Sequence, residues 1–195
     1  MCGRYLIDDE ASAHIEIWMK NSPGTQLDYA TGEIFPTNIA PVMTQAGAAA
    51  VKWGFPHWSN SSVIINARAE TALEKNMFRK PLREQRCVIL ASGYYEWAAQ
   101  GETKKKDKYL LHMPNDEILY MAGILNNFRD STGTDYTAFV ILTTDASNSI
   151  SHIHNRMPLI LHGDELDNWL SDPHFMEQTL HRSSPELSWG IAAHG

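Results

Sequence analysis

The sequence of 195 residues contains only two cysteines, Cys2 and Cys87. Two cysteines cannot form a framework of several disulfides, so a small disulfide-bonded secreted fold is excluded. No apolar run approaches the roughly 18 residues that cross a membrane, and the segment after Met1 does not resemble a signal peptide. We therefore expect a reduced, cytoplasmic protein with no membrane partner.

Recognisable cofactor and metal motifs are also absent. The sequence has no Gly-x-Gly-x-x-Gly, no Walker loop, no Gly-x-Ser-x-Gly, no His-Glu-x-x-His and no Cys-x-x-Cys. His152 and His154 could share one face of a strand, but the spacing indicates no third ligand. We therefore expect neither a cofactor nor a metal site.

Length and composition are those of an ordinary folded domain. Hydrophobic residues make up 43% and charged residues 20%, which excludes a disordered chain. The length predicts one domain over residues 1–195, and we expect a monomer. The net charge of −7 argues weakly against a nucleic-acid partner, yet residues 51–110 carry 11 basic and 6 acidic side chains. This basic segment is either an anion-binding face or a solvated surface.

Short apolar runs separated by polar and glycine-containing clusters predict a fold rich in strands. Many short strands with few helices favour an α+β fold with a mostly antiparallel, partly barrel-like sheet and a few short flanking helices. We expect helices at residues 10–20, 69–76, 146–150 and 164–170. We expect strands at residues 3–7, 40–44, 48–54, 62–66, 86–90, 93–98, 108–113, 117–125 and 136–143.

Cys2 carries the most informative chemistry, because it follows the initiator methionine. Methionine before a small side chain is usually removed, which would leave an α-amine and a thiol on one residue. Such an aminothiol can capture an aldehyde twice, since the amine forms an imine and the thiolate then closes a thiazolidine ring. The same pair could act as an N-terminal nucleophile in amide hydrolysis, with the amine as base. A Met-Cys start without chemical consequence is the third interpretation.

Four other clusters combine aromatic, charged and amide side chains. One is a tight aromatic turn, one presents an amide and a guanidinium before a helix, one places a carboxylate in an aromatic strand, and one joins an imidazole to an arginine. Burial would raise the pKa of that carboxyl group, which suits acid–base work. Taken singly, each cluster could equally be an aromatic core, a helix cap, a salt bridge or a buried histidine. The clusters are Trp53–Trp58, Ile65–Thr71, Ser92–Trp97 and Ile153–Pro158.

Together, these segments resemble the SOS response-associated peptidase (SRAP) family, and the resemblance runs nearly from end to end. Members of that family sense abasic sites in single-stranded DNA and trap the ring-opened sugar aldehyde as a DNA–protein crosslink through an N-terminal cysteine. The family name also implies a cysteine peptidase activity, associated with removal of the residues before that cysteine, beside lyase-type chemistry. The matching motifs include Met1–Tyr5, Phe35–Thr37, Trp53–Pro56, Asn66–Thr71, Gly93–Trp97, Ile141–Thr144 and His154–Pro158.

The resemblance implies a role for each residue that matches a family motif. Cys2 would be the nucleophile, and Asn66 would position its reacting groups. Glu96 and His154 would be the proton-transfer pair. The partner would be single-stranded DNA with an abasic site, held by phosphate contacts, a hydroxyl group and a wedge against the bases. The residues implied for DNA are Arg4, Arg68, Arg156, Thr143, Trp58 and Pro36, with Arg79, Arg83 and Arg86 in the same basic segment as Arg68.

Two other functions remain open at this point. The chain could be a cysteine-dependent peptidase or amidase that acts on protein substrates. It could also be a module that binds single-stranded nucleic acid without a covalent step, with Cys2 idle. An oligonucleotide with one abasic site separates the three hypotheses, because only the first predicts a covalent adduct.

Overall fold

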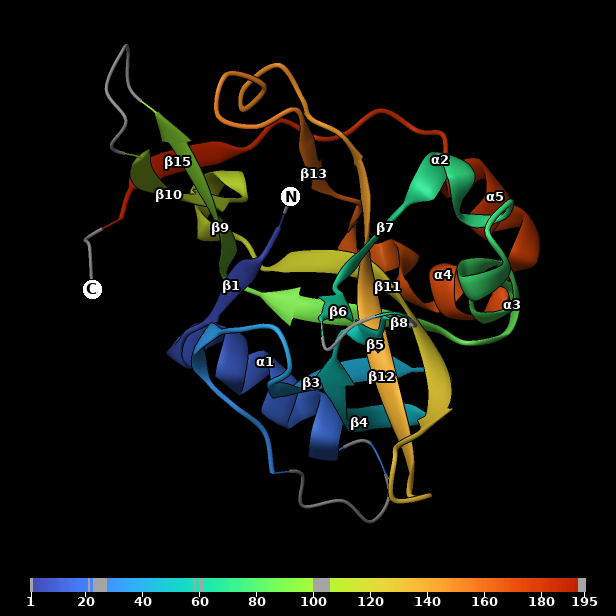
Figure 1. Ribbon diagram of the computed structural model, residues 1–195. Helices are drawn as coiled ribbons and strands as arrows, with labels where there is room; N and C mark the ends of the chain where they lie inside the picture. The colour runs from blue at the N-terminus through green and yellow to red at the C-terminus, as the bar shows by residue number, and fades with distance from the viewer. Residues whose placement is uncertain are drawn as a thin grey trace.

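The computed structural model describes residues 2–20, 22, 28–57, 59, 62–99 and 106–192. Two main sheets and a few short helices make up this part of the chain (Figure 1). The first sheet has five strands, and every pair in it is antiparallel. Its order is β15 (Ser188–Ile191), β10 (Lys106–His112), β9 (Gly93–Ala99), β1 (Arg4–Ile7) and β2 (Gly32–Ile34).

The second sheet has eight strands and closes on itself. Because β11 pairs with both β8 and β12, the strands β12, β4, β3, β8 and β11 form a ring. The pairs are antiparallel except for β12 with β4 and β12 with β7, which are parallel. Its strands are β3 (Ile39–Thr44), β4 (Gly47–Trp53), β7 (Asn66–Arg68), β8 (Arg86–Ala91), β11 (Leu119–Arg129), β12 (Asp135–Asp145), β13 (Arg156–Pro158) and β14 (Ile160–Leu161). The prediction of a mostly antiparallel, partly barrel-like α+β fold is therefore confirmed.

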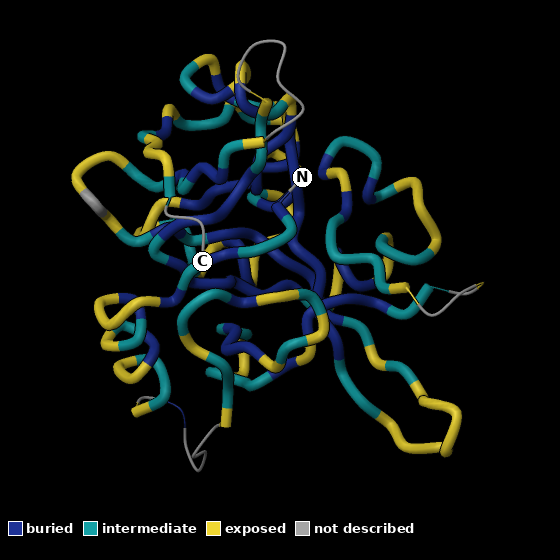
Figure 2. Tube along the Cα trace, turned by 60° about the vertical axis from the view of Figure 1, so that its left-hand side comes forward, coloured by how far each residue is buried: buried dark blue, intermediate teal, exposed yellow. Residues whose placement is uncertain are grey.

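Alternation along the barrel strands explains why the protein has two apolar cores. In β12, Phe139 and Ile141 enter one core together with Cys2 and Tyr5, whereas the intervening Val140 enters the other. Successive side chains of a strand point to opposite faces, so a strand buried on both faces has to be apolar throughout. In Figure 2 these cores are the buried part of the tube through the middle of the molecule, and most of the exposed residues lie at its periphery.

The helices cover the two cores. α1 (Asp9–Lys20) buries Ala11 and Ile15 in the core that holds Cys2. The remaining helices gather on the other side of the barrel, as Figure 1 shows. They are α2 (Ala69–Ala72), α3 (Asn76–Glu84), α4 (Leu166–Ser171) and α5 (Pro173–Thr179). The described chain also has 3-10 turns at Pro114–Asp116 and Gly163–Glu165, and a small hairpin of β5 (Phe55–Pro56) and β6 (Val63–Ile64). Among the residues described, no helix has both the length and the apolar character needed to cross a membrane.

Two of the predicted helices are wrong. The helix expected at 69–76 is interrupted at residues 73–75, so α2 and α3 are separate and α3 extends to Glu84. Residues 146–150 form turns and no helix, and the carboxylate of Asp145 just before them binds Arg156. The helix expected at 164–170 is present as α4 after a 3-10 turn. α5 was not predicted, nor were the short strands β2, β5, β7, β13, β14 and β15.

Candidate active site

Cys2 lies directly before β1 and is fully buried in the first core. Pairing of β1 with β9 sets Tyr5 opposite Tyr94 and Arg4 opposite Tyr95, so the start of the chain is held against the strand that carries Glu96. The thiol makes a weak hydrogen bond to the carbonyl oxygen of Arg4, with Sγ 3.8 Å away. Burial raises the pKa of the Cys2 thiol, and the nearby charge of Glu96 raises it further. The thiol is therefore protonated at neutral pH.

Asn66 contacts the backbone of Cys2 directly. β7 lies parallel to β12, with Asn66 opposite Ile141, and this places the amide beside the start of the chain. Asn66 Nδ2 donates to the carbonyl oxygens of Cys2 (3.1 Å) and Ile65 (3.0 Å). Asn66 Oδ1 is buried and has no hydrogen-bond partner among the described residues. A buried acceptor without a partner is costly, so this oxygen is available to an N–H or O–H group that enters the site.

Glu96 and Tyr94 come from the same face of β9, because they are two residues apart on one strand. Glu96 is 6% exposed. Burial raises the pKa of Tyr94 well above its usual value, and the charges of Cys2 and Glu96 raise it further. The three groups therefore lie within electrostatic reach of one another in a site from which water is largely excluded.

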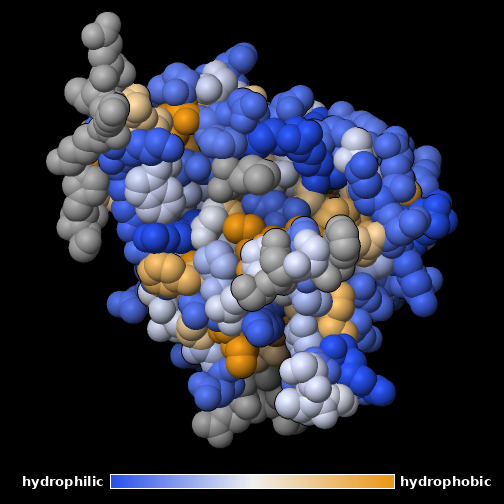
Figure 3. All heavy atoms as spheres, viewed as in Figure 1, coloured by the Kyte–Doolittle hydropathy of each residue, from blue (hydrophilic) through white to orange (hydrophobic). Residues whose placement is uncertain are grey.

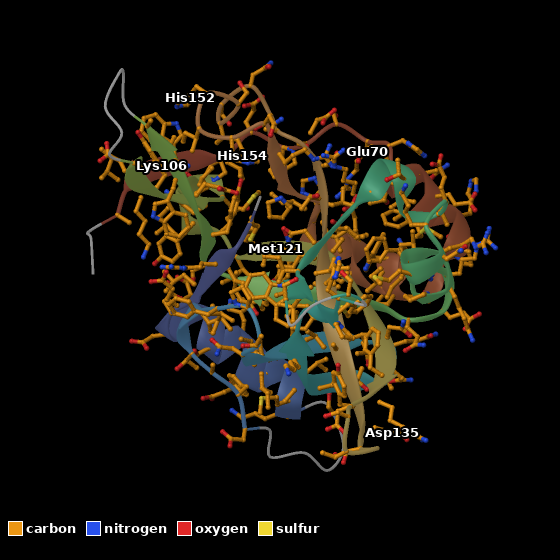
Figure 4. The ribbon with its side chains drawn as sticks, viewed as in Figure 1. Glu70, Lys106, Met121, Asp135, His152 and His154 are labelled. Carbon is orange, nitrogen blue, oxygen red and sulfur yellow. The ribbon has the colours of Figure 1, made fainter. Side chains whose placement is uncertain are left out.

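His154 lies on the loop between β12 and β13, at the end of the molecule where Figure 1 marks the N-terminus (Figure 4). Its Nδ1 accepts a hydrogen bond from the backbone N–H of Arg156 at 2.9 Å, so the neutral ring carries its proton on Nε2. The carbonyl oxygen of Arg156 lies 3.2 Å from the same Nδ1. His154 is thus held through one ring nitrogen against the backbone of Arg156.

The side chain of Arg156 joins the His154 loop to the helix that follows Asn66. Its Nη1 and Nη2 donate to the two carboxylate oxygens of Glu70 at 2.7 and 2.8 Å, and Nη1 also donates to Asp145 at 2.6 Å. Burial acts to raise the pKa of Glu70, but its bonds to Arg156 outweigh this and the pKa is lowered. We call Glu70, Arg156 and Asp145 the arginine bracket. Figure 4 shows Glu70 on the helix that follows β7.

The family model for SOS response associated peptidase (SRAP) matches residues 1–189. The chain belongs to the SRAP family.

Two relatives carry names that describe what they process. The abasic site processing protein YoqW of Bacillus subtilis is 30% identical over 199 residues, which cover 92% of this chain and 86% of YoqW. The abasic site processing protein HMCES of Gallus gallus is 36% identical over 150 residues, which cover 62% of this chain and 44% of HMCES. A crystal structure of a protein from Bacteroides thetaiotaomicron has the same fold, with a TM-score of 0.80 and 24% identity over 98% of this chain and 92% of that one.

Of the candidate SRAP residues for DNA, Arg68 and Arg4 reach the surface. Arg68 is exposed on β7, and its positive charge helps to lower the pKa of the Glu70 carboxyl group. Arg4 is 40% exposed at its side chain, pairs with Glu33 at 3.1 Å and stacks on the rings of Phe35 and Trp97. Both arginines are therefore accessible to a phosphate, although Arg4 already has a carboxylate partner.

Two other candidates for DNA contact, Arg156 and Thr143, are placed differently from the expectation. The guanidinium of Arg156 is occupied by the arginine bracket, and Thr143 is fully buried with its hydroxyl 3.4 Å from the carbonyl oxygen of Ala67. In this conformation neither can touch a phosphate, which is a correction to the roles that the resemblance implied. Pro36 is half-buried in the turn before β3. Trp58 lies outside the described residues.

Arg86 also has a role that the sequence did not predict. It is 6% exposed, and its guanidinium donates to the carbonyl oxygens of Trp169, Leu82, Arg83 and Leu170. It holds the ends of α3 and α4 together and is not part of an anion-binding face. Arg79 and Arg83 are exposed on α3, so the basic segment 51–110 is divided between a surface and a structural contact.

Glu70 and Tyr94 are the site residues that sequence reasoning missed. Both stand inside motifs that the sequence analysis singled out, but their roles depend on partners far along the chain. Glu70 meets Arg156 across 86 positions. Glu70 follows Arg68 by two residues, and nothing in that part of the sequence indicates so distant a partner.

Proposed function

We propose that this chain recognises abasic sites in single-stranded DNA and captures the ring-opened sugar aldehyde covalently through Cys2. The names of the relatives support the substrate class. The observation that carries the chemistry is a buried cysteine near the chain start, with its carbonyl held by Asn66 and its thiol in electrostatic reach of Glu96. An aldehyde is the group that an N-terminal cysteine captures most durably.

The first step is removal of Met1. Hydrolysis of the Met1–Cys2 peptide bond consumes one water and frees the α-amine of Cys2, which the peptide bond otherwise blocks. The N-terminal cysteine then has both nucleophiles on one residue. We propose that this chain processes itself, which would account for the word peptidase in the family description.

The capture proceeds through two new bonds. The amine attacks the aldehyde carbon, and loss of one water leaves an imine. The sulfur of Cys2 then adds to the imine carbon, and the thiol proton passes to the nitrogen of the new thiazolidine ring. Because burial and Glu96 keep the thiol protonated, the sulfur adds only as its proton leaves, and the amine reacts first.

In this proposal Glu96 and Asn66 act on the attacking amine, and His154 acts on the closed sugar ring. An aldehyde is formed only when the closed sugar transfers a proton from its hydroxyl group to its ring oxygen. Imidazole suits that transfer near neutral pH, and the backbone N–H of Arg156 holds the His154 ring in place through Nδ1. Glu96 would accept the proton of the attacking amine, while Asn66 Oδ1 accepts its second N–H.

A single-stranded oligonucleotide with one abasic site tests the proposal. The expected result is a heat-stable adduct that migrates slowly on a denaturing gel, with no adduct on the matched intact oligonucleotide. Equal affinity for both oligonucleotides without an adduct would overturn the proposal in favour of a non-covalent binding module. Peptide cleavage without an adduct would overturn it in favour of a peptidase with protein substrates.

A further inference from the structure

One face of the five-stranded sheet runs from the candidate site to the edge of the molecule. Glu96 pairs with Tyr109 across β9 and β10, Tyr109 pairs with Ile191 across β10 and β15, and Leu111 pairs with Trp189. Paired residues point to the same side of a sheet, and so do residues two apart on one strand. The side chains of Glu96, Tyr109, Trp189 and Ile191 therefore share one face.

The side chains on this face become more exposed toward β15, the edge strand of the sheet. Glu96 and Tyr109 are both 6% exposed, whereas Trp189 is 45% exposed and Ile191 is 60% exposed. The side of the molecule seen in Figure 3 is mainly hydrophilic, with apolar side chains in small patches. The exposed aromatic ring of Trp189 lies on the same face as Glu96 and therefore favours a ligand with an apolar, flat surface.

The ring of Trp189 is held in place by two aromatic neighbours. The centroid of Tyr109 lies 5.6 Å away with the rings at 72°, and that of His152 lies 5.2 Å away with the rings at 63°. Both contacts are edge-on, which is a favourable geometry for aromatic pairs. His152 belongs to the same loop as His154, and Figure 4 shows the two histidines on that loop. The indole thus stands between β10 and the loop that carries the proposed proton donor.

We propose that Trp189, fixed by Tyr109 and His152, forms a subsite that stacks one unpaired nucleobase of the DNA strand beside the abasic site. The proposal rests on the proposed function. Because this face is continuous with Glu96, the ligand that we assign to it is a base of the same DNA strand. Single strands are bound through aromatic platforms, because every base has a flat face. A partner protein fits the subsite less well. The exposed parts of Trp189 and Ile191 offer about 200 Å², against the roughly 800 Å² per partner of a stable interface.

The experiment compares Trp189→Ala and Trp189→Phe with the wild type on two oligonucleotides. Both contain one abasic site, but in the second the flanking nucleotides are replaced by base-free sugar spacers. We expect Trp189→Ala to raise the concentration for half-maximal crosslinking about tenfold on the first oligonucleotide. We expect no change on the second and an unchanged maximal rate on both. Trp189→Phe keeps a flat ring and should retain most of the affinity.

Ile17→Ala is the matched control, because Ile17 is 55% exposed but lies on α1. Equal weakening of Trp189→Ala on the two oligonucleotides would overturn the stacking subsite. A lower maximal rate would overturn it too, since Trp189 would then position the His154 loop. Sedimentation that reveals a wild-type dimer lost in Trp189→Ala would assign the face to a second copy of the chain. If the wild type forms no adduct at all, the proposed function fails, and Kd on the same two oligonucleotides still tests stacking.

Discussion

Glu70→Gln tests whether the arginine bracket serves the reaction as well as the fold. The substitution keeps the shape of the side chain but removes its charge, and the amide offers Arg156 one acceptor oxygen where the carboxylate offers two. Arg156 keeps Asp145, which accepts at 2.6 Å. Because the backbone N–H of Arg156 holds His154 Nδ1, looser anchoring of Arg156 should displace the imidazole.

The expected magnitudes follow from the burial of the two partners. Hydrogen bonds to charged groups contribute about 1.5–3 kcal/mol each, but the Glu70 side chain is 35% exposed. Since solvent weakens such pairs, we expect Glu70→Gln to lower the free energy of unfolding by about 1–2 kcal/mol, or Tm by about 2–6 °C. A misplacement near 1 Å costs up to about 100-fold in rate, and with Asp145 still in place we expect crosslinking to slow by about tenfold.

The stability difference should also depend on pH. The pKa of Glu70 is lowered in the folded protein, so its ion pair contributes stability above the ordinary glutamate pKa of about 4.3. That contribution is lost as the pH falls through the folded-state value. The wild type should therefore be more stable than Glu70→Gln at pH 7, and the difference should shrink below about pH 4.

The assay is single-turnover crosslinking of an abasic oligonucleotide, with thermal unfolding of the same samples. Glu74→Gln is the control, because Glu74 is exposed, lies four residues further along the chain and loses the same charge. Nitrogen NMR of His154 adds a direct measure, since the neutral wild-type ring should carry its proton on Nε2. A normal crosslinking rate in a destabilised Glu70→Gln would refute the reasoning and leave the bracket a purely structural element.

Other predictions follow from the same contacts. Glu96→Gln should slow crosslinking by about 10²–10⁴-fold yet shift the pH profile of Cys2 alkylation to lower pH, because the charge of Glu96 raises the thiol pKa. If the rate of crosslinking and the rate of Cys2 alkylation at a given pH both fell in Glu96→Gln, or both rose, the proton-acceptor role would be contradicted. His154→Ala should slow capture of a closed abasic sugar more than capture of a non-cyclising aldehyde analogue. Equal slowing would exclude a role in ring opening. Arg68→Ala should reduce the slope of log affinity against log salt by about 0.7 on single strands, and an unchanged slope would exclude a phosphate contact.

The strands could be predicted from the sequence wherever both faces are buried. The central runs of β8 (residues 87–91) and β12 (residues 138–142) are apolar because each face meets a core, and the positions of both strands were predicted to within a few residues. The break between α2 and α3 could not be predicted, because residues 69–84 carry no strong signal for a stop near Leu73. β15 was missed because both of its large apolar side chains, Trp189 and Ile191, are exposed, and its pairing with β10 depends on a distant strand.

The candidate site could also be predicted from the sequence only in part. The aminothiol of an N-terminal Cys2 indicated aldehyde chemistry, and the family resemblance implied the roles of Asn66 and Glu96. The structure brings Asn66 onto the carbonyl of Cys2 across 64 positions. The role of Arg156 could not be read in the same manner. An arginine suits a phosphate and a carboxylate equally well, and only the packing of α2 against β12 brings Glu70 to its guanidinium.

The mass of the adduct tests the central claim most directly. Wild-type protein is incubated with an oligonucleotide that holds one abasic site, and the intact crosslink and its peptides are analysed by mass spectrometry. The account predicts the mass of the chain without Met1 plus the oligonucleotide minus one water, with the added mass on Cys2, and no adduct from Cys2→Ala. An undiminished heat-stable adduct from Cys2→Ala, or an adduct on a chain that retains Met1, would contradict it.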